Sequence, residues 1–309
     1  MAQSSSDFRG RDFLAIKFWP VWMLLGLLWL FAQLPYAAQM WLGRRIGELL
    51  GAMHGSRRQI AQTNINLCFP ELTVNARRKI LRDQFRALGM GVFEMGALWF
   101  YNRDKLRRRV RVTGLEHLQQ AQALGKGVIV LQAHFTTLEL GANLLALEYT
   151  MDANYDPPKN ALYAAFLLHQ RKRNFVEMID NRSVRRLARR LREGHAIWYS
   201  PDQYVKPKRG GVATQFFARD TKTTDATSRI AKLTGAAVVP FLPVRTSKHG
   251  HYELRLLPAL NDFPGEDTVA DTQRINDLFE AHIREFPQQY FWVHKRFKRS
   301  NPNAKDYYA

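Results

Sequence analysis

Apolar and polar positions follow two different periods along this chain. Short apolar runs at 127–132, 195–200 and 236–242 are typical of buried strands. Residues 252–257 alternate between apolar and polar, which predicts an edge strand. Elsewhere the apolar residues recur at helical spacing. That spacing predicts helices over 74–100, 136–147, 160–172, 182–193, 222–234 and 268–285.

The order of these elements predicts the fold class. Strands that alternate with helices indicate an α/β protein with a mostly parallel central sheet flanked by helices. The chain has 309 residues, enough to bury a substantial core. No internal repeat or linker divides the sequence after residue 44, so we interpret 44–309 as one domain.

An apolar run near the start of the chain has a different character. Residues 18–43 form a run of 26 residues without a charge, and a membrane-spanning helix needs about 20. The run includes aromatic residues suited to a membrane interface, namely Trp19, Trp22, Trp29, Tyr36 and Trp41. We therefore predict a membrane anchor helix over 18–43, preceded by a tail over 1–17.

Two other interpretations of this run stay open, because Gln33 and Pro35 interrupt its end. It could be a buried core helix, or a helix that lies in one leaflet. A cleaved signal peptide fits poorly, since the run is long and no small-x-small site clearly follows it.

Charges around the run predict its orientation. Four arginines and one glutamate follow it before residue 60, whereas three basic residues and two aspartates precede it. Positive residues are enriched on the cytoplasmic side of membrane helices. We expect a single-pass or monotopic protein whose body lies on the cytoplasmic side.

The overall charge narrows the class of partner. The chain has 46 Lys and Arg against 27 Asp and Glu, a net charge of +19. Such a surplus implies nucleic acid, a lipid headgroup surface or an acidic protein as partner. Residues 44–111 alone carry 15 basic against 5 acidic residues, close to where the phosphates of a monolayer would lie. This placement favours a membrane partner.

Two further basic segments admit more than one interpretation. The predicted helix 182–193 combines an apolar stripe with a basic one, which consists of Arg182, Arg185, Arg186 and Arg189. That stripe is either a solvated face or a dock for phosphate groups or an acidic carrier protein. Basic and aromatic residues also mix at 292–299, a pattern found in proteins that bind single-stranded nucleic acid. Given the anchor, we predict no nucleic-acid partner.

Metal and disulfide chemistry are not expected. Cys68 is the single cysteine, which excludes an intramolecular disulfide and a Cys-rich zinc site. The nine histidines include no HExxH motif, so we predict no metal site. No Walker or dinucleotide-binding glycine pattern is present, and we expect no cofactor.

The segment from His134 to Glu139 is the candidate for catalysis. His134 follows the predicted strand 127–132, and Glu139 lies five residues later. On one continuous helix the two side chains would point about 140° apart. If His134 lies in the turn and Glu139 in the first helical turn, they can meet. We then predict that Glu139 orients the imidazole while its other nitrogen takes a proton from a hydroxyl. The alternative is a core histidine with a nearby carboxylate.

Several motifs carry a resemblance to a known family. In chain order they are Asn64–Glu71, Gly89–Glu94, His134–Glu139, Trp198–Asp202, Phe216–Phe217 with Thr223–Thr224, Ala237–Phe241 and Trp292–Lys298. In this order the chain resembles the lipid A late acyltransferases, the lauroyl/myristoyl transferases of Gram-negative bacteria. That family is a branch of the lysophosphatidate-type acyltransferases. The resemblance covers nearly the whole chain after the anchor and makes 44–309 an acyltransferase domain.

The resemblance implies an activity and a location. The family moves a fatty acyl chain from acyl carrier protein to a hydroxyl of a lipid A precursor, at the inner membrane. It implies that His134 is the general base and Glu139 its partner. Arg171 and Arg173 match basic positions of the family, and we expect them at phosphate or thioester groups. Asp202 is expected to orient an arginine or the acceptor, or to close a turn.

The chain also departs from the family pattern near these contacts. Tyr155-Asp156-Pro157 stands where the family commonly has Tyr-Arg-Pro, and Ala218 replaces a usual glycine. The family's arginine falls on Asn181, with Arg182 one step along, which we include as a phosphate-binding candidate. Two alternatives therefore stay open: an acyltransferase for another anionic lipid such as a lysophospholipid, or a membrane-bound paralogue without activity.

Overall fold

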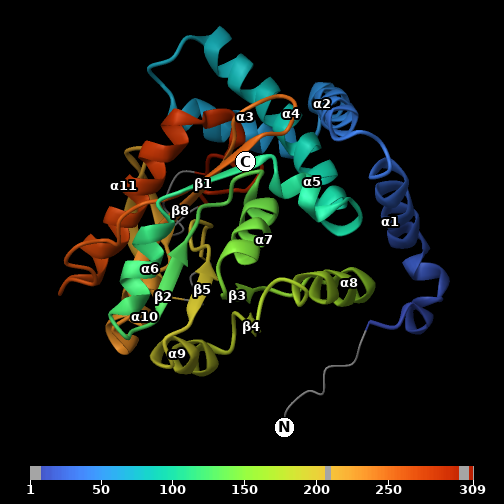
Figure 1. Ribbon diagram of the computed structural model, residues 1–309. Helices are drawn as coiled ribbons and strands as arrows, with labels where there is room; N and C mark the ends of the chain where they lie inside the picture. Colours follow the sequence, from blue (N-terminus) through green and yellow to red (C-terminus); the bar gives the residue numbers. More distant parts are fainter. Residues whose placement is uncertain (1–7, 206–209, 299–305, 309) are drawn as a thin grey trace.

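A computed structural model of the protein describes residues 8–205, 210–298 and 306–308. Its centre is a seven-stranded sheet in the order β1-β9-β8-β2-β5-β3-β4 (Figure 1). The strands are β1 (Val110–Thr113), β2 (Val128–Leu131), β3 (Asp152–Tyr155), β4 (Met178–Asp180), β5 (Ala196–Tyr199), β8 (Ala237–Arg245) and β9 (Tyr252–Leu256). Neighbouring strands are parallel except for the antiparallel pair β8–β9. The predicted α/β fold with a mostly parallel sheet flanked by helices is confirmed.

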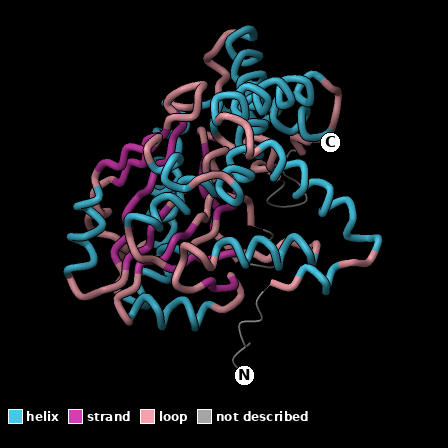
Figure 2. Tube along the Cα trace, turned by 45° about the vertical axis from the view of Figure 1, so that its right-hand side comes forward, coloured by secondary structure: helices cyan, strands magenta, loops and turns pink. Residues whose placement is uncertain are grey.

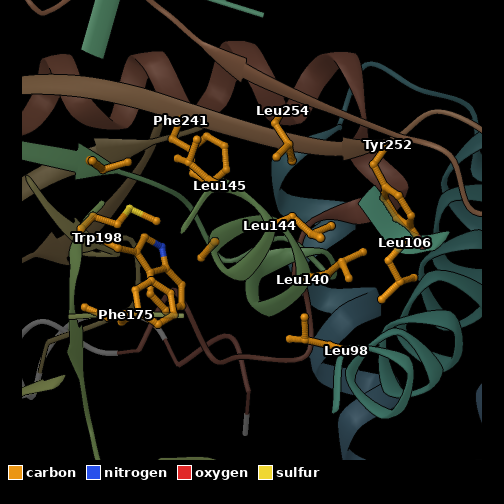
Figure 3. Packing of buried hydrophobic residues seen from close by; sticks show 14 of the residues in the cluster. Leu98, Leu106, Leu140, Leu144, Leu145, Phe175, Trp198, Phe241, Tyr252 and Leu254 are labelled. Atoms are coloured by element: carbon orange, nitrogen blue, oxygen red, sulfur yellow. The ribbon is translucent and has the colours of Figure 1, made fainter. Parts of the chain in front are cut away.

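Helices cover both faces of the sheet (Figure 2). One hydrophobic cluster, part of which Figure 3 shows, contains buried side chains of α1, α2, α4, α6, α7 and α8. The second contains those of α3, α9, α10 and α11, and α4 contributes to both. The helices are α1 (Trp19–Phe31), α2 (Tyr36–Ala52), α3 (Ser56–Cys68), α4 (Val74–Phe100), α5 (Arg103–Arg107), α6 (Leu115–Ala123), α7 (Leu138–Glu148), α8 (Ala161–Arg171), α9 (Val184–Arg192), α10 (Ala226–Thr234) and α11 (Thr268–Glu285).

The central strand β2 shows why an uninterrupted apolar run forms here. Val128 and Val130 belong to one cluster, and Ile129 and Leu131 belong to the other. Successive side chains of a strand point to opposite faces, so a strand covered on both faces needs apolar residues throughout. All four residues are at most 2% exposed.

The sheet also differs from the prediction at several strands. The segment predicted as an edge strand, 252–257, forms β9 but lies between β1 and β8. The edge strand on that side is β1, and β4 is the edge strand on the other side, next to β3. The sequence patterns predicted none of these three strands. These strands have only three or four residues, which is too short for alternation to be recognised.

A separate antiparallel hairpin precedes α10. Its strands are β6 (Val212–Phe216) and β7 (Arg219–Thr223), so the predicted helix 222–234 begins only at Ala226. The two turn residues, Phe217 and Ala218, have φ of 51° and 53°. A two-residue turn with positive φ at both positions favours glycine, so Phe217 and Ala218 adopt a backbone conformation that residues with a Cβ rarely take.

The prediction of one continuous helix over 18–43 is wrong. The run is divided into α1 and α2 by residues 32–35. Pro35 precedes α2, lacks a donor and disfavours helical geometry in the residue before it. The Gln39 amide donates to the carbonyl of Leu34, which binds this break to the next helix. The 13 residues of α1 extend about 20 Å, short of the roughly 30 Å hydrocarbon core.

The membrane-spanning prediction therefore has no support in the structure. Among the residues it describes, no helix has both the length and the apolar character needed to cross a bilayer. Instead, α1 lies at the outside of the molecule (Figure 1) and packs against α4, where Leu28 lies next to Gly96.

Glycines bring α2 and α4 into backbone contact. Gly43, Gly47 and Gly51 recur every four residues and so lie on one face of α2. A Cβ at Gly47 would lie 2.2 Å from the Phe85 carbonyl oxygen, and one at Gly89 would lie 2.0 Å from the Gly43 carbonyl oxygen. Only glycine permits this approach, and it fixes α2 along α4.

Candidate active site

His134 and Asp202 form a hydrogen-bonded pair beyond the carboxyl ends of the inner strands β2 and β5. The Nδ1 atom of His134 lies 2.5 Å from Oδ1 of Asp202. The backbone N–H of His134 donates to the other carboxylate oxygen, Oδ2, at 3.0 Å. With Nδ1 protonated toward Asp202, Nε2 has its lone pair available, and no hydrogen bond to Nε2 is recorded within the described residues. This arrangement suits a general base.

The strand order explains how residues so far apart in sequence meet. His134 follows β2 and Asp202 follows β5, and these two strands are parallel neighbours. The carboxyl ends of parallel neighbours lie at the same edge of a sheet, where α/β proteins usually bind ligands. The loop after β2 turns at Phe135 and Thr136 before α7 begins, so His134 lies outside the helix as predicted.

The carboxylate of Asp202 is buried and ionised. Its side chain is 1% exposed, and Tyr290 donates a hydrogen bond from its hydroxyl to Oδ2 at 3.0 Å. Burial alone raises the pKa of Asp202, but the electrostatic interaction with His134 and the hydrogen bonds from His134 and Tyr290 outweigh burial and lower the pKa below its ordinary value. A buried anion beside the imidazole stabilises the imidazolium that proton transfer creates.

Glu139 has a different partner from the one predicted. It lies in the first turn of α7, but its two carboxylate oxygens accept hydrogen bonds from Arg171 at 2.9 and 2.6 Å. Asn143 donates to the same carboxylate at 3.1 Å. No hydrogen bond between Glu139 and His134 occurs among the described residues. Asp202 takes the orienting position because it comes from the adjacent strand, while Arg171 of α8 holds Glu139.

Both His134 and Glu139 nevertheless line one cavity of about 320 Å³. Its wall is mostly apolar and comes from α4, the loop after β2, the start of α7, the loop after β5 and a C-terminal segment. The lining residues are Leu88, Gly91, Val92, Glu94, Met95, His134, Phe135, Thr136, Leu138, Glu139, Leu140, Gln203 and Phe291. A polar pair at the wall of an apolar cavity is the arrangement expected for chemistry on a lipid-like substrate.

The three arginines predicted to bind phosphate do not line this cavity. Arg173 is exposed beyond the end of α8 and donates to Gln170. Arg182 is 73% exposed and forms an ion pair with Asp180. Arg171 is 11% exposed, lies with its guanidinium 5.6 Å from the Trp198 ring centre, and is engaged by Glu139. None of the three lines the cavity.

The basic stripe of α9 is largely neutralised by neighbouring acids. Arg186 pairs with Glu177, and Arg189 pairs with Glu193. Arg182 pairs with Asp180. Arg190, which lies outside the stripe on the same helix, donates two hydrogen bonds to the buried carboxylate of Asp152. These contacts favour a structural role for the stripe over a docking surface.

Residues of the C-terminal segment support the pair and were not predicted as site residues. Tyr290, His294 and Arg296 border a small space together with His134 and Asp202. Burial, first of all, lowers the pKa of His294 to about 4, so its imidazole is neutral at pH 7, where it accepts a hydrogen bond from the Tyr204 amide. The family motif at 292–298 and the mixture of basic and aromatic residues at 292–299 pointed to this segment, but neither assigned it to the catalytic site.

The described residues include no group of three or more His, Cys, Asp or Glu side chains that could hold a metal ion. The imidazole of His134 lines an apolar cavity and is paired with the carboxylate of Asp202. Such a combination fits proton transfer from a hydroxyl group.

Comparison with known proteins identifies the class to which this fold and site belong. The family described as bacterial lipid A biosynthesis acyltransferase matches residues 8–299. The chain belongs to this family, and it is therefore an acyltransferase.

Individual relatives span nearly the whole chain. It is 35% identical over 288 residues to the lipid A biosynthesis palmitoleoyltransferase of Escherichia coli (strain K12), covering 93% of this chain and 94% of the relative. It is 33% identical to the lauroyltransferase of the same organism, covering 91% and 92%. The myristoyltransferase is 25% identical, covering 94% and 91%. The family predicted from the motifs is confirmed.

Proposed function

We propose that this protein transfers a fatty acyl chain from acyl carrier protein to a hydroxyl group of a lipid A precursor. The observation that carries the proposal is the hydrogen bond between Asp202 and His134, because His134 lines an apolar cavity. Family membership supports the acyl transfer and the lipid A-type acceptor.

The proposed step is an alcoholysis of a thioester with His134 as general base. Nε2 of His134 removes the proton of the acceptor hydroxyl while the oxygen forms a bond to the thioester carbonyl carbon. The carbon–sulfur bond then breaks, and the imidazolium returns its proton to the departing thiolate. Asp202 holds the imidazole in one tautomer and balances its positive charge.

The tetrahedral intermediate carries a negative oxygen that needs hydrogen-bond donors. The first turn of α7 offers the backbone N–H groups of Glu139 and Leu140, for which no backbone acceptor is recorded among the described residues. Both residues line the cavity that contains His134. We assign the oxyanion to this helix start, where unpaired N–H groups and the helix dipole favour a negative charge.

Glu139 and Arg171 keep a place in the proposal, with changed roles. The two hydrogen bonds that Arg171 donates to Glu139 fix the Glu139 side chain at the cavity wall and neutralise its charge there. An unneutralised carboxylate would oppose the developing oxyanion. Arg171 therefore acts through Glu139, as a positioning residue.

Membrane attachment is proposed through α1 and α2 lying in one leaflet. Large apolar side chains of α1 face outward, including Met23 at 63% exposed and Leu27 at 51%. On α2 Trp41 is 55% and Leu49 is 66% exposed. A helix with an unburied apolar face is typical of interfacial attachment. The surplus of positive charge supports attraction to anionic lipid and to an acidic carrier protein.

The test is transfer from several acyl-carrier donors to a tetra-acylated precursor, with product mass as the readout. We expect His134→Ala to lower kcat/KM by about 10²–10⁴-fold, since it removes the general base. Asp202→Asn is expected to lower kcat by a similar order, because it disturbs the tautomer and the charge. Transfer at the wild-type rate by His134→Ala would refute the mechanism.

Glu139→Gln is the discriminating variant, because the sequence pattern alone favoured Glu139 as the orienting group. In the proposed mechanism it retains transfer better than Asp202→Asn, because the amide preserves the shape of the cavity wall. The reverse order would assign the orienting role to Glu139. Acylation of a lysophospholipid in place of the tetra-acylated precursor would establish a different acceptor.

A further inference from the structure

A strongly basic groove lies on the other side of α4 from the catalytic cavity. It has a volume of about 470 Å³, within the range of small-molecule sites. Six basic residues and one acid, Asp83, line it together with polar and apolar groups. The lining residues are Arg44, Lys79, Arg82, Asp83, Arg86, Ala87, Met90, Arg245, Thr246, Ser247, Lys248, Gln288 and Gln289.

Half of these cations have their charge balanced within the protein. Lys79 pairs with Asp83, and Arg86 pairs with both Asp83 and Glu48. Arg245 is buried and pairs with the buried Glu94 through hydrogen bonds of 2.6 and 2.7 Å. These ion pairs shape the groove but offer little net charge to a ligand.

The other three cations are Arg44, Arg82 and Lys248. No ion pair is recorded for any of them within residues 8–205, 210–298 and 306–308. They come from α2, α4 and the turn after β8, so three separate segments converge their charge on one concave surface. The groove therefore combines three cations without an acidic partner with neutral hydrogen-bond donors such as Ser247 and Gln288. A phosphate group binds to this combination of charges and donors.

The groove and the catalytic cavity share a wall. Along α4, Ala87 and Met90 line the groove, whereas Leu88 and Gly91 line the cavity. The ion pair of Arg245 and Glu94 passes through this wall, since the arginine lines the groove and the glutamate the cavity.

The C-terminal segment makes a second connection between the two spaces. The carbonyl of Gln289, a lining residue of the groove, accepts a hydrogen bond from the Thr136 amide at 2.7 Å. Thr136 is two residues from His134 and lines the cavity. A ligand bound in the groove therefore lies within a helix diameter, about 10–12 Å, of the catalytic cavity.

The surroundings of the groove indicate a lipid as the source of the phosphate. Arg44 lies within one turn of the exposed Trp41 on α2, the helix whose outer face is apolar. In Figure 1, α2 runs beside α4, and both form the side of the molecule from which α1 extends. A lipid with its acyl chains along that apolar side would place its phosphates at the groove.

On this basis, and resting on the proposed function, we propose that the groove lined by α4, Arg44 of α2 and the turn after β8 binds a phosphate of the glycolipid acceptor. Arg44, Arg82 and Lys248 are the binding residues, and Gln288 and Ser247 offer neutral donors. The phosphate in the groove would position the headgroup so that its acyl-chain hydroxyl reaches over α4 to His134. The groove is thereby a specificity-determining site for phosphorylated acceptors.

The test compares a triple variant, Arg44→Ala with Arg82→Ala and Lys248→Ala, with the wild type on two acceptors. One is the phosphorylated tetra-acylated precursor, and the other is the same precursor after phosphatase treatment. We expect the triple variant to raise KM for the phosphorylated acceptor by at least about tenfold, a loss equivalent to one charged hydrogen bond. KM for the acyl-carrier donor should stay unchanged, and the treated acceptor should not distinguish the two proteins.

A matched control removes the same charges elsewhere. Arg78→Ala, Lys126→Ala and Arg185→Ala also delete two arginines and one lysine, all exposed and outside the groove. This control should keep the wild-type KM. An unchanged acceptor KM in the groove variant, or an equal rise in the control, would overturn the proposal. A rise confined to the donor KM would also overturn it and assign the groove to the phosphate of the carrier's prosthetic arm.

A binding measurement separates this proposal from the proposed activity. Binding of the phosphorylated precursor in detergent is measured on His134→Ala protein with and without the three groove substitutions, so no turnover is needed. If the wild type transfers no acyl chain, the proposed function fails while this measurement still decides the groove. Equal binding by both proteins would refute the groove as a phosphate site.

Discussion

At the scale of single residues, the surroundings of each ionisable group decide what it can do. Asp202 is fixed by hydrogen bonds from His134 and Tyr290 and is almost fully buried, so its charge acts on the imidazole without screening by water. Glu139 lies at the same cavity, but Arg171 takes both of its oxygens. Two carboxylates near one histidine thus have separate tasks.

A second histidine makes the stability of the protein depend on pH. His282 of α11 is 4% exposed, neither ring nitrogen has a hydrogen-bond partner within the described part, and its ring centre lies 4.6 Å from that of Phe135. Burial first, and the charge of Arg255 second, lower its pKa in the folded protein to about 4. The unfolded chain binds the proton at the ordinary pKa of about 6.5.

We predict that His282 reduces stability as the pH falls from about 6.5 to about 4, because the unfolded state then binds a proton that the folded state rejects. Above pH 6.5 the effect is absent. The free energy of unfolding, measured by denaturant titration across this range, should fall less in His282→Leu than in the wild type. The exposed His249→Leu variant should follow the wild type. Identical pH dependence in all three would contradict the assignment.

At the scale of elements, the contact between α2 and α4 positions residues of the groove and lies next to the wall of the catalytic cavity. The glycines of α2 allow its backbone to touch that of α4, and this contact places Arg44 at the groove. The same helix α4 forms the wall between the groove and the cavity. A change in the α2–α4 distance would therefore alter both spaces.

We predict that Gly47→Ala destabilises the protein by about 1–3 kcal/mol, the usual cost of overpacking. Its Cβ would lie 2.2 Å from the Phe85 carbonyl oxygen, a backbone atom that cannot move aside alone. Gly26→Ala on α1 is the control, because nothing lies within 4 Å of its Cβ and alanine is the better helix former. Denaturant unfolding should separate the two variants; equal free energies of unfolding would show that the glycine contact is not required.

At the scale of the whole molecule, charge and apolar surface lie on the same side. Most outward residues of α1 and α2 are apolar, although Arg45 of α2 is also exposed, and the groove beside them is basic. These surfaces complement a membrane with anionic lipids, where acyl chains and phosphates lie at different depths.

We predict that the triple change Met23→Gln, Leu27→Gln and Leu30→Gln lowers binding to vesicles of phosphatidylcholine and phosphatidylglycerol by at least about tenfold. Each of the three side chains is more than half exposed, so the fold should be retained while apolar contact with lipid is lost. Vesicle flotation measures the bound fraction.

The control for vesicle binding removes exposed apolar residues elsewhere. Leu124→Gln, Val176→Gln and Leu233→Gln change side chains that are 73%, 59% and 55% exposed on other surfaces. This variant should bind vesicles as the wild type does. Equal losses in both triple variants would mean that α1 has no special part in attachment.

The sequence by itself determined the local elements and the family. Apolar period alone predicted the α/β class, the strand β2 that ends before His134, and the long helix α4, because burial on one or both faces leaves a repeat in the sequence. Apolar periodicity did not predict the short outer strands, because three or four residues do not show a period. It did not predict the break at Pro35 either, because a run of apolar residues does not show where it bends.

Only the tertiary structure decided which side chains meet. His134 and Asp202 are 68 residues apart and become partners because β2 and β5 are neighbours in the sheet, a pairing that no local pattern encodes. The nearer Glu139 was the natural choice from sequence, but α8 brings Arg171 to it first. Local periodicity reports the face that each element buries, whereas the order of strands and the packing of helices select the contacts between elements.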